Sequence, residues 1–259
     1  MMLSRISRIS RSGIAFGTFF IGALILACGP FLLLQIIPFK KHKKQLYARG
    51  MIRLTFQSFV ALMTFLGLIH KPIIKGKPNK IINKPFIYAA NHPSLIDVVL
   101  LASILPDATC IVKQDYWDNF FLGGVIKAVG YIPNTDGPEL VAACQKAFDR
   151  GLSLMIFPEG TRSPESGMLP FKRGTARLLF GSRANIIPVI ITCKPRALMK
   201  HQKWYEIPKE KVQLAIHFMP QIKVPDLIES ETSMPKKARL LTSYMEKYFR
   251  EQIEALQPA

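Results

Sequence analysis

The pattern of hydrophobic and polar positions divides the chain into an apolar N-terminal stretch and a longer region of short alternating elements. Residues 13–39 contain no charged side chain, and a run of this length is sufficient to cross the hydrocarbon core of a bilayer. A second apolar stretch, residues 54–69, is shorter and includes polar side chains, so it is more typical of a re-entrant or interfacial helix. We therefore expect residues 1–70 to form a helical pair that anchors the chain in a membrane.

Beyond residue 70 the pattern is that of a globular domain. Short apolar runs typical of buried strands alternate with amphipathic stretches typical of helices. Strands are expected at residues 86–90, 109–113, 152–157, 186–192 and 212–219, and helices at residues 95–105, 120–129, 139–150, 175–182 and 235–256. Because strands that alternate with helices form layered α/β structures, residues 71–259 are predicted to be one α/β domain, with a largely parallel or mixed sheet flanked by helices.

The charge of the chain favours anionic partners. The sequence has 35 Lys and Arg against 17 Asp and Glu, a formal charge of +18, and 49% of its residues are hydrophobic. Disordered chains combine high charge with low hydrophobicity, so that class is excluded, and this composition favours an anionic membrane surface over nucleic acid. The four cysteines include no close pair and the five histidines are scattered, so neither a disulfide framework nor a metal site is expected.

Basic residues flank the apolar run on both sides, with more of them downstream. By the positive-inside rule this arrangement places the bulk of the chain on the cytoplasmic side, and we expect it at the inner membrane of the cell. A cleaved signal peptide is the alternative, because residues 25–28 resemble a lipoprotein processing site. The apolar run continues past Cys28 into a basic cluster, which favours a retained segment that spans the bilayer or lies in one leaflet.

The first candidate chemical motif is Asn91-His92-Pro93-Ser94-Leu95-Ile96-Asp97, between a predicted strand and a predicted helix. Proline suits the first helical position, which would put His92 at the mouth of the helix and Asp97 in its first turns. Asp97 can then accept a hydrogen bond from one ring nitrogen and leave the other as a general base. The alternative is a capping histidine beside an unrelated aspartate.

The second candidate motif is Phe157-Pro158-Glu159-Gly160-Thr161-Arg162-Ser163, at the end of a predicted strand. Ligands of open α/β sheets bind beyond the carboxyl ends of the strands, where a glycine allows close approach and an arginine can clamp a phosphate with two parallel hydrogen bonds. Lys172 and Arg173 follow, just before a predicted helix whose N-terminus favours anions. The alternative is a solvated surface turn.

Together the two motifs resemble those of glycerolipid acyltransferases of the 1-acylglycerol-3-phosphate acyltransferase type, within the lysophospholipid acyltransferase superfamily. That family is marked by an Asn-His-x4-Asp motif and a Phe-Pro-Glu-Gly-Thr-Arg-Ser motif, and Ile187-Pro188-Val189-Ile190 is similar to its hydrophobic-proline motif. The resemblance covers residues 74–224. It implies an α/β catalytic domain preceded by a membrane-embedded helical pair.

The resemblance also implies an O-acyltransferase that needs no cofactor beyond its acyl donor. His92, oriented by Asp97, would deprotonate the hydroxyl of a lysolipid, and the alkoxide would attack the thioester of acyl carrier protein or acyl-CoA. The expected acceptor is 1-acyl-sn-glycerol 3-phosphate, which would give phosphatidic acid in phospholipid biosynthesis. The residues expected to bind its head group are Glu159, Gly160, Thr161 and Arg162, with Lys172 and Arg173 adding positive charge.

One departure from the family pattern concerns the acceptor. The second family motif commonly ends in an arginine, where this chain has Asn134 and Thr135. The missing charge leaves open a different lyso-acceptor, in a specialised lipid pathway or one of the aryl-polyene type. A non-enzymatic basic protein that binds membranes or nucleic acid is the remaining alternative. It predicts aromatic residues interleaved with basic ones, whereas the aromatic residues here lie in apolar strands and helices.

Overall fold

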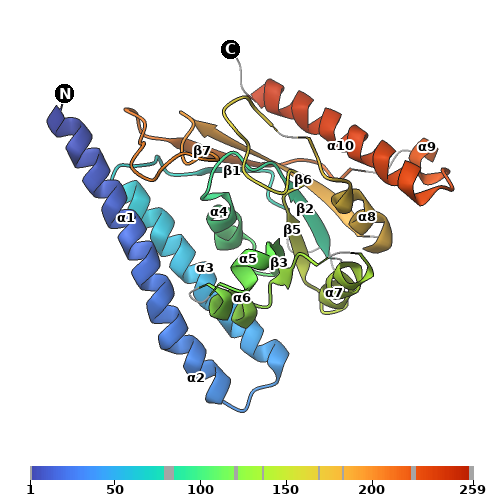
Figure 1. Ribbon diagram of the computed structural model, residues 1–259, viewed down its shortest axis with the longest axis horizontal. Coiled ribbons are helices and arrows are strands. Elements are labelled where there is room, and N and C mark those ends of the chain that lie inside the picture. Colours follow the sequence, from blue (N-terminus) through green and yellow to red (C-terminus); the bar gives the residue numbers. More distant parts are fainter. Residues whose placement is uncertain are drawn as a thin grey trace.

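The computed structural model describes residues 2–78, 85–119, 122–135, 137–168, 170–182, 184–222 and 226–256. Over these residues the predicted fold class is confirmed, because seven strands form one mixed sheet that helices flank and precede (Figure 1). The strands are β1 (Ile73–Lys75), β2 (Phe86–Ala90), β3 (Ala108–Val112), β4 (Ile132–Pro133), β5 (Ser153–Ile156), β6 (Asn185–Lys194) and β7 (Gln213–Phe218).

The strands are arranged in the order β1-β7-β6-β2-β5-β3-β4. The pairing of β6 with β7 is antiparallel, and every other neighbouring pair is parallel. All five residues of the central strand β2 are buried, as expected for a strand covered on both faces. The five strands from β6 to β4 run in the same direction, so their carboxyl ends meet at one edge of the sheet.

Helices cover both faces of the sheet. One face packs against α7 (Pro138–Phe148), α8 (Arg173–Ser182) and α10 (Met234–Leu256). The amphipathic pattern near the C-terminus is confirmed in α10, where Leu241, Met245 and Phe249 are buried against this layer. The other face packs against α4 (Asp97–Ile104) and the N-terminal helices (Figure 1). Burial of these apolar faces, at about 25 cal/mol per Å², holds the layers together.

Three helices precede the sheet: α1 (Met2–Cys28), α2 (Pro30–Ile36) and α3 (Lys41–Phe65). The segment Arg5–Ile36 is the one helical stretch among the described residues that is long and apolar enough to cross a membrane. The prediction that the second apolar element begins at residue 54 is wrong, because α3 starts within the basic cluster at Lys41. Its buried stripe includes Ala48 and Ile52, and helical periodicity turns the neighbouring lysines outward.

The N-terminal helices share a hydrophobic core with the sheet. Phe59 and Met63 of α3 belong to the same buried cluster as Leu100 and Leu101 of α4. Arg53 Nε and Gln57 Nε2 donate hydrogen bonds of 3.3 and 2.9 Å to the same carbonyl of α4, which satisfies one of the orphan acceptors at the end of that helix. The division of the chain after residue 70 therefore stays a prediction.

Several short elements are absent from the sequence-based expectations. They are β1, β4, α5 (Gln114–Trp117) and α9 (Asp226–Glu229), which are too short to show a periodicity. The helix expected from residue 120 is found as α6 (Gly123–Val129), and residues 120 and 121 lie outside the described part of the chain. The other predicted strands and helices are present, with ends that differ by one or two residues.

Candidate active site

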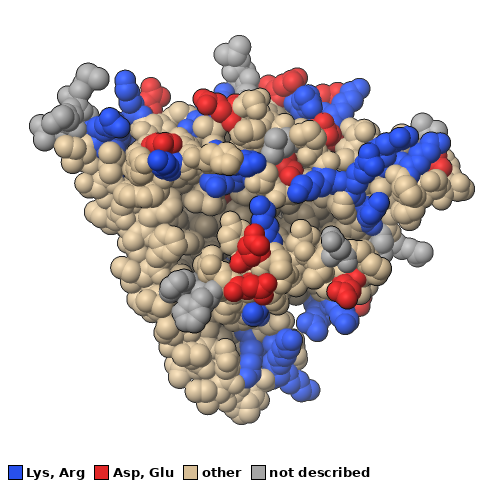
Figure 2. Space-filling view, in the orientation of Figure 1, with Lys and Arg blue, Asp and Glu red and all other residues tan. Residues whose placement is uncertain are grey.

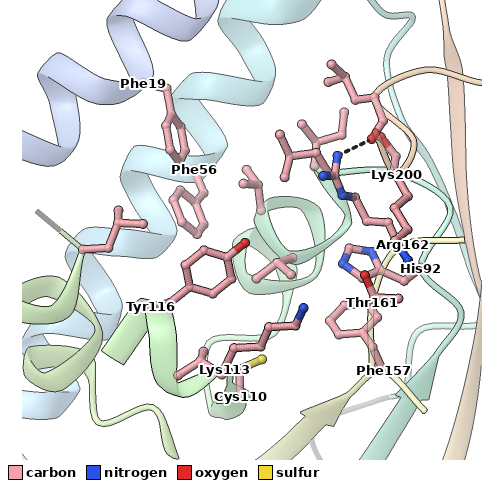
Figure 3. Close-up of a pocket in the computed structure, with 18 of the residues that line it drawn as sticks. Phe19, Phe56, His92, Cys110, Lys113, Tyr116, Phe157, Thr161, Arg162 and Lys200 are labelled. Atoms are coloured by element: carbon pink, nitrogen blue, oxygen red, sulfur yellow. Dashed lines mark hydrogen bonds between the residues drawn. The ribbon is translucent and has the colours of Figure 1, made fainter. Parts of the chain in front are cut away.

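Residues that follow four parallel strands meet at the carboxyl edge of the sheet. His92 follows β2, Lys113 follows β3, Asn134 follows β4 and Phe157 follows β5. All four line one cavity of about 830 Å³ (Figure 3). The predicted binding edge of the α/β sheet is therefore where the structure forms its large cavity.

His92 and Asp97 form a hydrogen-bonded pair. His92 Nδ1 lies 2.9 Å from Asp97 Oδ2, and the backbone N–H of Ser94 donates to the same oxygen at 2.7 Å. The prediction that Pro93 starts the helix is wrong, because α4 begins at Asp97 and the preceding residues form a turn. The turn folds back onto the Asp97 carboxylate, whereas two residues five apart within a regular helix would face different directions.

The environment of this pair suits proton transfer. The side chain of Asp97 is fully buried and that of His92 is 14% exposed. Burial raises the pKa of Asp97 above its ordinary value, while the hydrogen bond and charge of His92 oppose that shift. A carboxylate so placed stabilises an imidazolium, and the tautomer that donates from Nδ1 leaves Nε2 as a proton acceptor.

The second motif clamps the backbone of His92. The ring of His92 stacks on Phe157 with centroids 4.3 Å apart. The N–H of His92 donates to Glu159 Oε1 at 2.9 Å, and the carbonyl of His92 accepts from the N–H of Ser163 at 2.7 Å. The two motifs thus form one hydrogen-bonded unit, which fixes the histidine from three directions.

Glu159 occupies a different place from the one expected for a head-group ligand. Its side chain is 2% exposed, and besides the N–H of His92 it accepts a hydrogen bond of 2.8 Å from Ser163 Oγ. The carboxylate therefore lies beneath the cavity and ties the two loops together. The neighbouring Gly160 has φ +68°, and a Cβ there would lie 2.7 Å from Lys172 Cε, so this turn requires glycine.

Arg162 lines the cavity but is partly engaged by the protein. Its Nη1 donates hydrogen bonds of 2.9 Å to the carbonyls of both Leu198 and Met199. A guanidinium carries five N–H groups, and the two on Nη1 are used by these carbonyls. The expected clamp on a phosphate, with two parallel hydrogen bonds, would therefore use the edge formed by Nε and Nη2. Thr161 and Lys172 also line the cavity, whereas Arg173 is exposed at the start of α8 and is not among the lining residues.

Two further cationic side chains, which are not part of the sequence motifs, extend into the cavity. Lys113 extends from the end of β3 toward His92, and Lys200 extends from the segment after β6 (Figure 3). The N–H of Asn134 donates to the carbonyl of Val112 at 2.8 Å, so Lys113 lies beside the position where the family pattern has arginine. Lys113 could have been identified from the sequence, because it directly follows a buried strand, as both motifs do.

The cavity has a polar end and an apolar end. The polar end comprises His92, Lys113, Thr161, Arg162 and Lys172, at the strand termini. The apolar end lies between the N-terminal helices and α4, and its wall includes Phe19, Phe56, Phe59 and Met63. The shape and lining match an amphiphile, with a charged head at the strand termini and an alkyl chain between the helices.

The apolar end is packed by aromatic rings. Phe19 of α1 stacks on Phe56 of α3 with centroids 6.2 Å apart, and meets Phe59 edge-on at 5.2 Å. A second cavity of about 310 Å³, lined by α1, α3 and α6, shares these three rings with the first. Among the described residues, no group of three His, Cys, Asp or Glu side chains could hold a metal ion.

Comparison with known proteins supports an acyl-transfer site. Residues 71–192 match the family model described as Acyltransferase. A 1-acyl-sn-glycerol-3-phosphate acyltransferase of Saccharomyces cerevisiae is 32% identical over 158 residues, which cover 58% of this chain and 50% of that protein. One of Salmonella typhimurium is 34% identical over 114 residues, 41% of this chain and 46% of that protein. The chain spans about half the length of these curated relatives.

A solved structure shares the whole fold. The crystal structure of the 1-acyl-sn-glycerophosphate acyltransferase PlsC from Thermotoga maritima has a TM-score of 0.74, and the match covers 99% of this chain and 98% of that one. The two sequences are 16% identical over this match. At that identity the similarity establishes the fold.

Proposed function

We propose that this chain, whose residues 71–192 match the acyltransferase family model, is a membrane-associated enzyme that transfers a fatty acyl group to the hydroxyl of a lysolipid. The observation that carries the proposal is the His92–Asp97 pair, because His92 lies with several cations at the polar end of a cavity whose other end is apolar. Because the curated relatives are named 1-acyl-sn-glycerol-3-phosphate acyltransferases, the proposed acceptor is 1-acyl-sn-glycerol 3-phosphate and the proposed product is phosphatidic acid.

The geometry supports a direct transfer with His92 as general base. His92 Nε2 removes the proton of the acceptor hydroxyl, and Asp97 stabilises the resulting imidazolium through Nδ1. The alkoxide attacks the thioester carbonyl of acyl carrier protein or acyl-CoA, a new C–O bond forms, and the C–S bond breaks. The departing thiolate takes the proton back from His92, so the enzyme returns to its starting state without a covalent acyl intermediate or a bound cofactor.

The cations at the polar end fit the acceptor's phosphate. Lys113 follows β3, whereas Arg162 and Lys172 lie in the loop between β5 and α8, and all three line the same cavity as His92. Hydrogen bonds between charged partners contribute about 1.5–3 kcal/mol each. Both substrates are anionic, so the net charge of +18 favours their approach as well as that of an anionic membrane.

The N-terminal helices are proposed to attach the enzyme to the cytoplasmic face of the inner membrane. Phe20, Ile25, Leu33 and Ile36 are large apolar side chains that α1 and α2 expose to the outside. The flank formed by α1 and α2 carries few Lys or Arg side chains in the face shown in Figure 2, whereas basic residues gather elsewhere on that face. Exposed apolar surface of this extent is typical of a membrane contact.

Genetic rescue tests the proposed reaction. The gene is expressed in a bacterial strain whose own 1-acylglycerol-3-phosphate acyltransferase is temperature-sensitive, and growth is scored at the restrictive temperature. We expect growth with the native chain and none with His92→Ala. Absence of growth with a native chain that is expressed and recovered with membranes would reject 1-acyl-sn-glycerol 3-phosphate as the acceptor.

Asn134, which stands where the family pattern has arginine, favours a second class of acceptor. Loss of one charge beside Lys113 favours a less anionic head group. Purified enzyme is offered a panel of lyso-acceptors and acyl donors, and the products are identified by mass spectrometry. If a non-phosphate acceptor is preferred, Asn134→Arg should shift the preference toward the phosphate.

A further inference from the structure

The segment between β6 and β7, residues 195–211, links the active site to the first helix; we call it the strap. At its first part, Ser94 Oγ donates to the carbonyl of Ala197 at 3.0 Å, and the N–H of Leu95 donates to the carbonyl of Leu198 at 3.1 Å. The carbonyls of Leu198 and Met199 hold Arg162. This part of the strap is therefore fixed to both catalytic loops.

The middle of the strap is fixed to α1. Ser12 Oγ donates a 2.7 Å hydrogen bond to the carbonyl of Trp204. The indole of Trp204 lies 3.5 Å from the position that a Cβ on Gly13 would take, and its ring centroid is 6.3 Å from that of Phe16. The strap is thus attached to α1 through one hydrogen bond at Ser12 and packing of the indole beside Gly13 and Phe16.

Trp204 and its neighbour remain accessible at this contact. Trp204 is 43% exposed and Tyr205 is 39% exposed, and their rings meet edge-on at 5.5 Å. Lys203 Nζ lies 5.5 Å from the centroid of Tyr205. Two exposed aromatic rings with polar atoms at their edges and a cation beside them have the composition of an interfacial membrane anchor.

The place on α1 against which Trp204 packs indicates that a membrane covers the exposed faces of these two rings. Arg11 is the last charged residue of α1, and the uncharged run that follows it begins at Ser12 and Gly13, where Trp204 packs on the helix. If α1 enters a bilayer, this junction lies at the boundary between the head groups and the acyl chains. Trp204 is thus placed at the depth where tryptophan side chains concentrate in membrane proteins.

We infer that Trp204 and Tyr205 form a second membrane contact, on the catalytic domain, that inserts into the head-group layer of an anionic bilayer. The inference rests on the proposed membrane attachment of α1 and adds a contact outside the N-terminal helices. Because Trp204, Lys200 and Leu198 of the strap also line the large cavity, this contact places the cavity and Arg162 at the level of the lipid head groups.

Depth-dependent fluorescence quenching tests the inference. Trp117 and Trp204 are the two tryptophans of the chain, so Trp117→Phe leaves Trp204 as the reporter. The full-length variant is mixed with phosphatidylcholine and phosphatidylglycerol vesicles that carry bromine either near the ester end or near the methyl end of the acyl chains. We expect a blue shift of the emission on binding, and stronger quenching by bromine near the ester end.

A matched reporter on another face serves as the control. The control is a triple variant that combines Trp117→Phe, Trp204→Phe and Tyr244→Trp. Its single indole lies at an exposed position of α10, on the opposite side of the sheet from α1. We expect neither a shift of its emission nor quenching. Each sample is floated with its vesicles, so that attachment is measured separately. Vesicle-bound protein with unquenched Trp204, or with Trp204 quenched best from the methyl end, would overturn the inference and leave the proposed attachment standing. Protein that does not float at all would overturn both.

Discussion

The two ends of the large cavity are built by different physical means. At the polar end, His92 is fixed by hydrogen bonds to Asp97, Glu159 and Ser163, all between 2.7 and 2.9 Å. At the apolar end, Phe19 and Phe56 meet through ring contacts between two helices. Proton transfer requires a fixed distance between donor and acceptor, whereas an alkyl chain requires only apolar volume. We therefore expect substitutions at the polar end to act on the rate of the reaction, and those at the apolar end to act on stability.

Removal of the general base tests the polar end most severely. We expect His92→Ala to lower acyl transfer by about 10²–10⁴-fold, which is the usual contribution of a positioned base. Initial rates are measured in detergent with a lysolipid acceptor and an acyl thioester. His70→Ala, which changes an exposed histidine outside the cavity, should retain the native rate. Activity of His92→Ala within about threefold of native would remove this residue from the mechanism.

Weakening the clamp on His92 should have the next largest effect. Glu159→Gln keeps the size of the side chain but replaces charge-assisted hydrogen bonds with neutral ones, which are roughly half as strong. We expect kcat to fall by on the order of tenfold with little change in the acceptor KM. Glu165→Gln, at an exposed position in the same loop, is the control. A raised acceptor KM at unchanged kcat would instead make Glu159 a head-group ligand.

Arg162 has both a structural and a binding role, because it holds the strap and also faces the cavity. Arg162→Lys keeps the charge but lacks the planar fork, which holds two carbonyls through Nη1 and has a second edge suited to a phosphate. We expect the KM for a phosphorylated acceptor to rise about tenfold, in line with the loss of one charged hydrogen bond. The same measurement on Arg177→Lys, at an exposed position of α8, should match native enzyme. A rise confined to the donor KM would assign Arg162 to the donor.

A substitution at the apolar end should change the rate least. Phe56→Ala removes a ring from the wall of both cavities, and we expect kcat to stay within about threefold of native while stability falls by up to about 3 kcal/mol. Thermal unfolding in detergent measures that loss. Phe65→Ala, at a position 87% exposed, should unfold at the native temperature. A large fall in kcat for Phe56→Ala at low temperature would contradict the contrast between the two ends.

The sequence predicted those features that depend on continuous burial or on local pairing. β2 and β6 are recognisable because buried strands are apolar throughout, and α10 because one of its faces is buried. The His92–Asp97 contact was also predicted, and its geometry confirms it. The resemblance to the acyltransferase family, inferred from three short motifs, is confirmed by the family match over residues 71–192.

Features that depend on the three-dimensional arrangement were missed. Glu159 and Arg162 have similar places in their motif, yet one lies beneath the cavity and the other in its wall, which spacing alone does not distinguish. Lys113 joins the site because β3 runs parallel to β5 and β4, and that register is a long-range property. The start of α4 was misplaced because the carboxylate of Asp97 holds a turn that competes with helix at Pro93.

The shared core of α3 and α4 has a consequence for how the protein is made. Translation produces α3 before α4, so the buried stripe that contains Phe59 and Met63 emerges from the ribosome before its partner helix exists. An apolar stripe without a partner invites aggregation in water, and a bilayer offers it an apolar environment at that moment. We expect the N-terminal helices to reach the membrane first and the sheet to fold against them there, so that the nascent enzyme is already among lipids when its active site is completed.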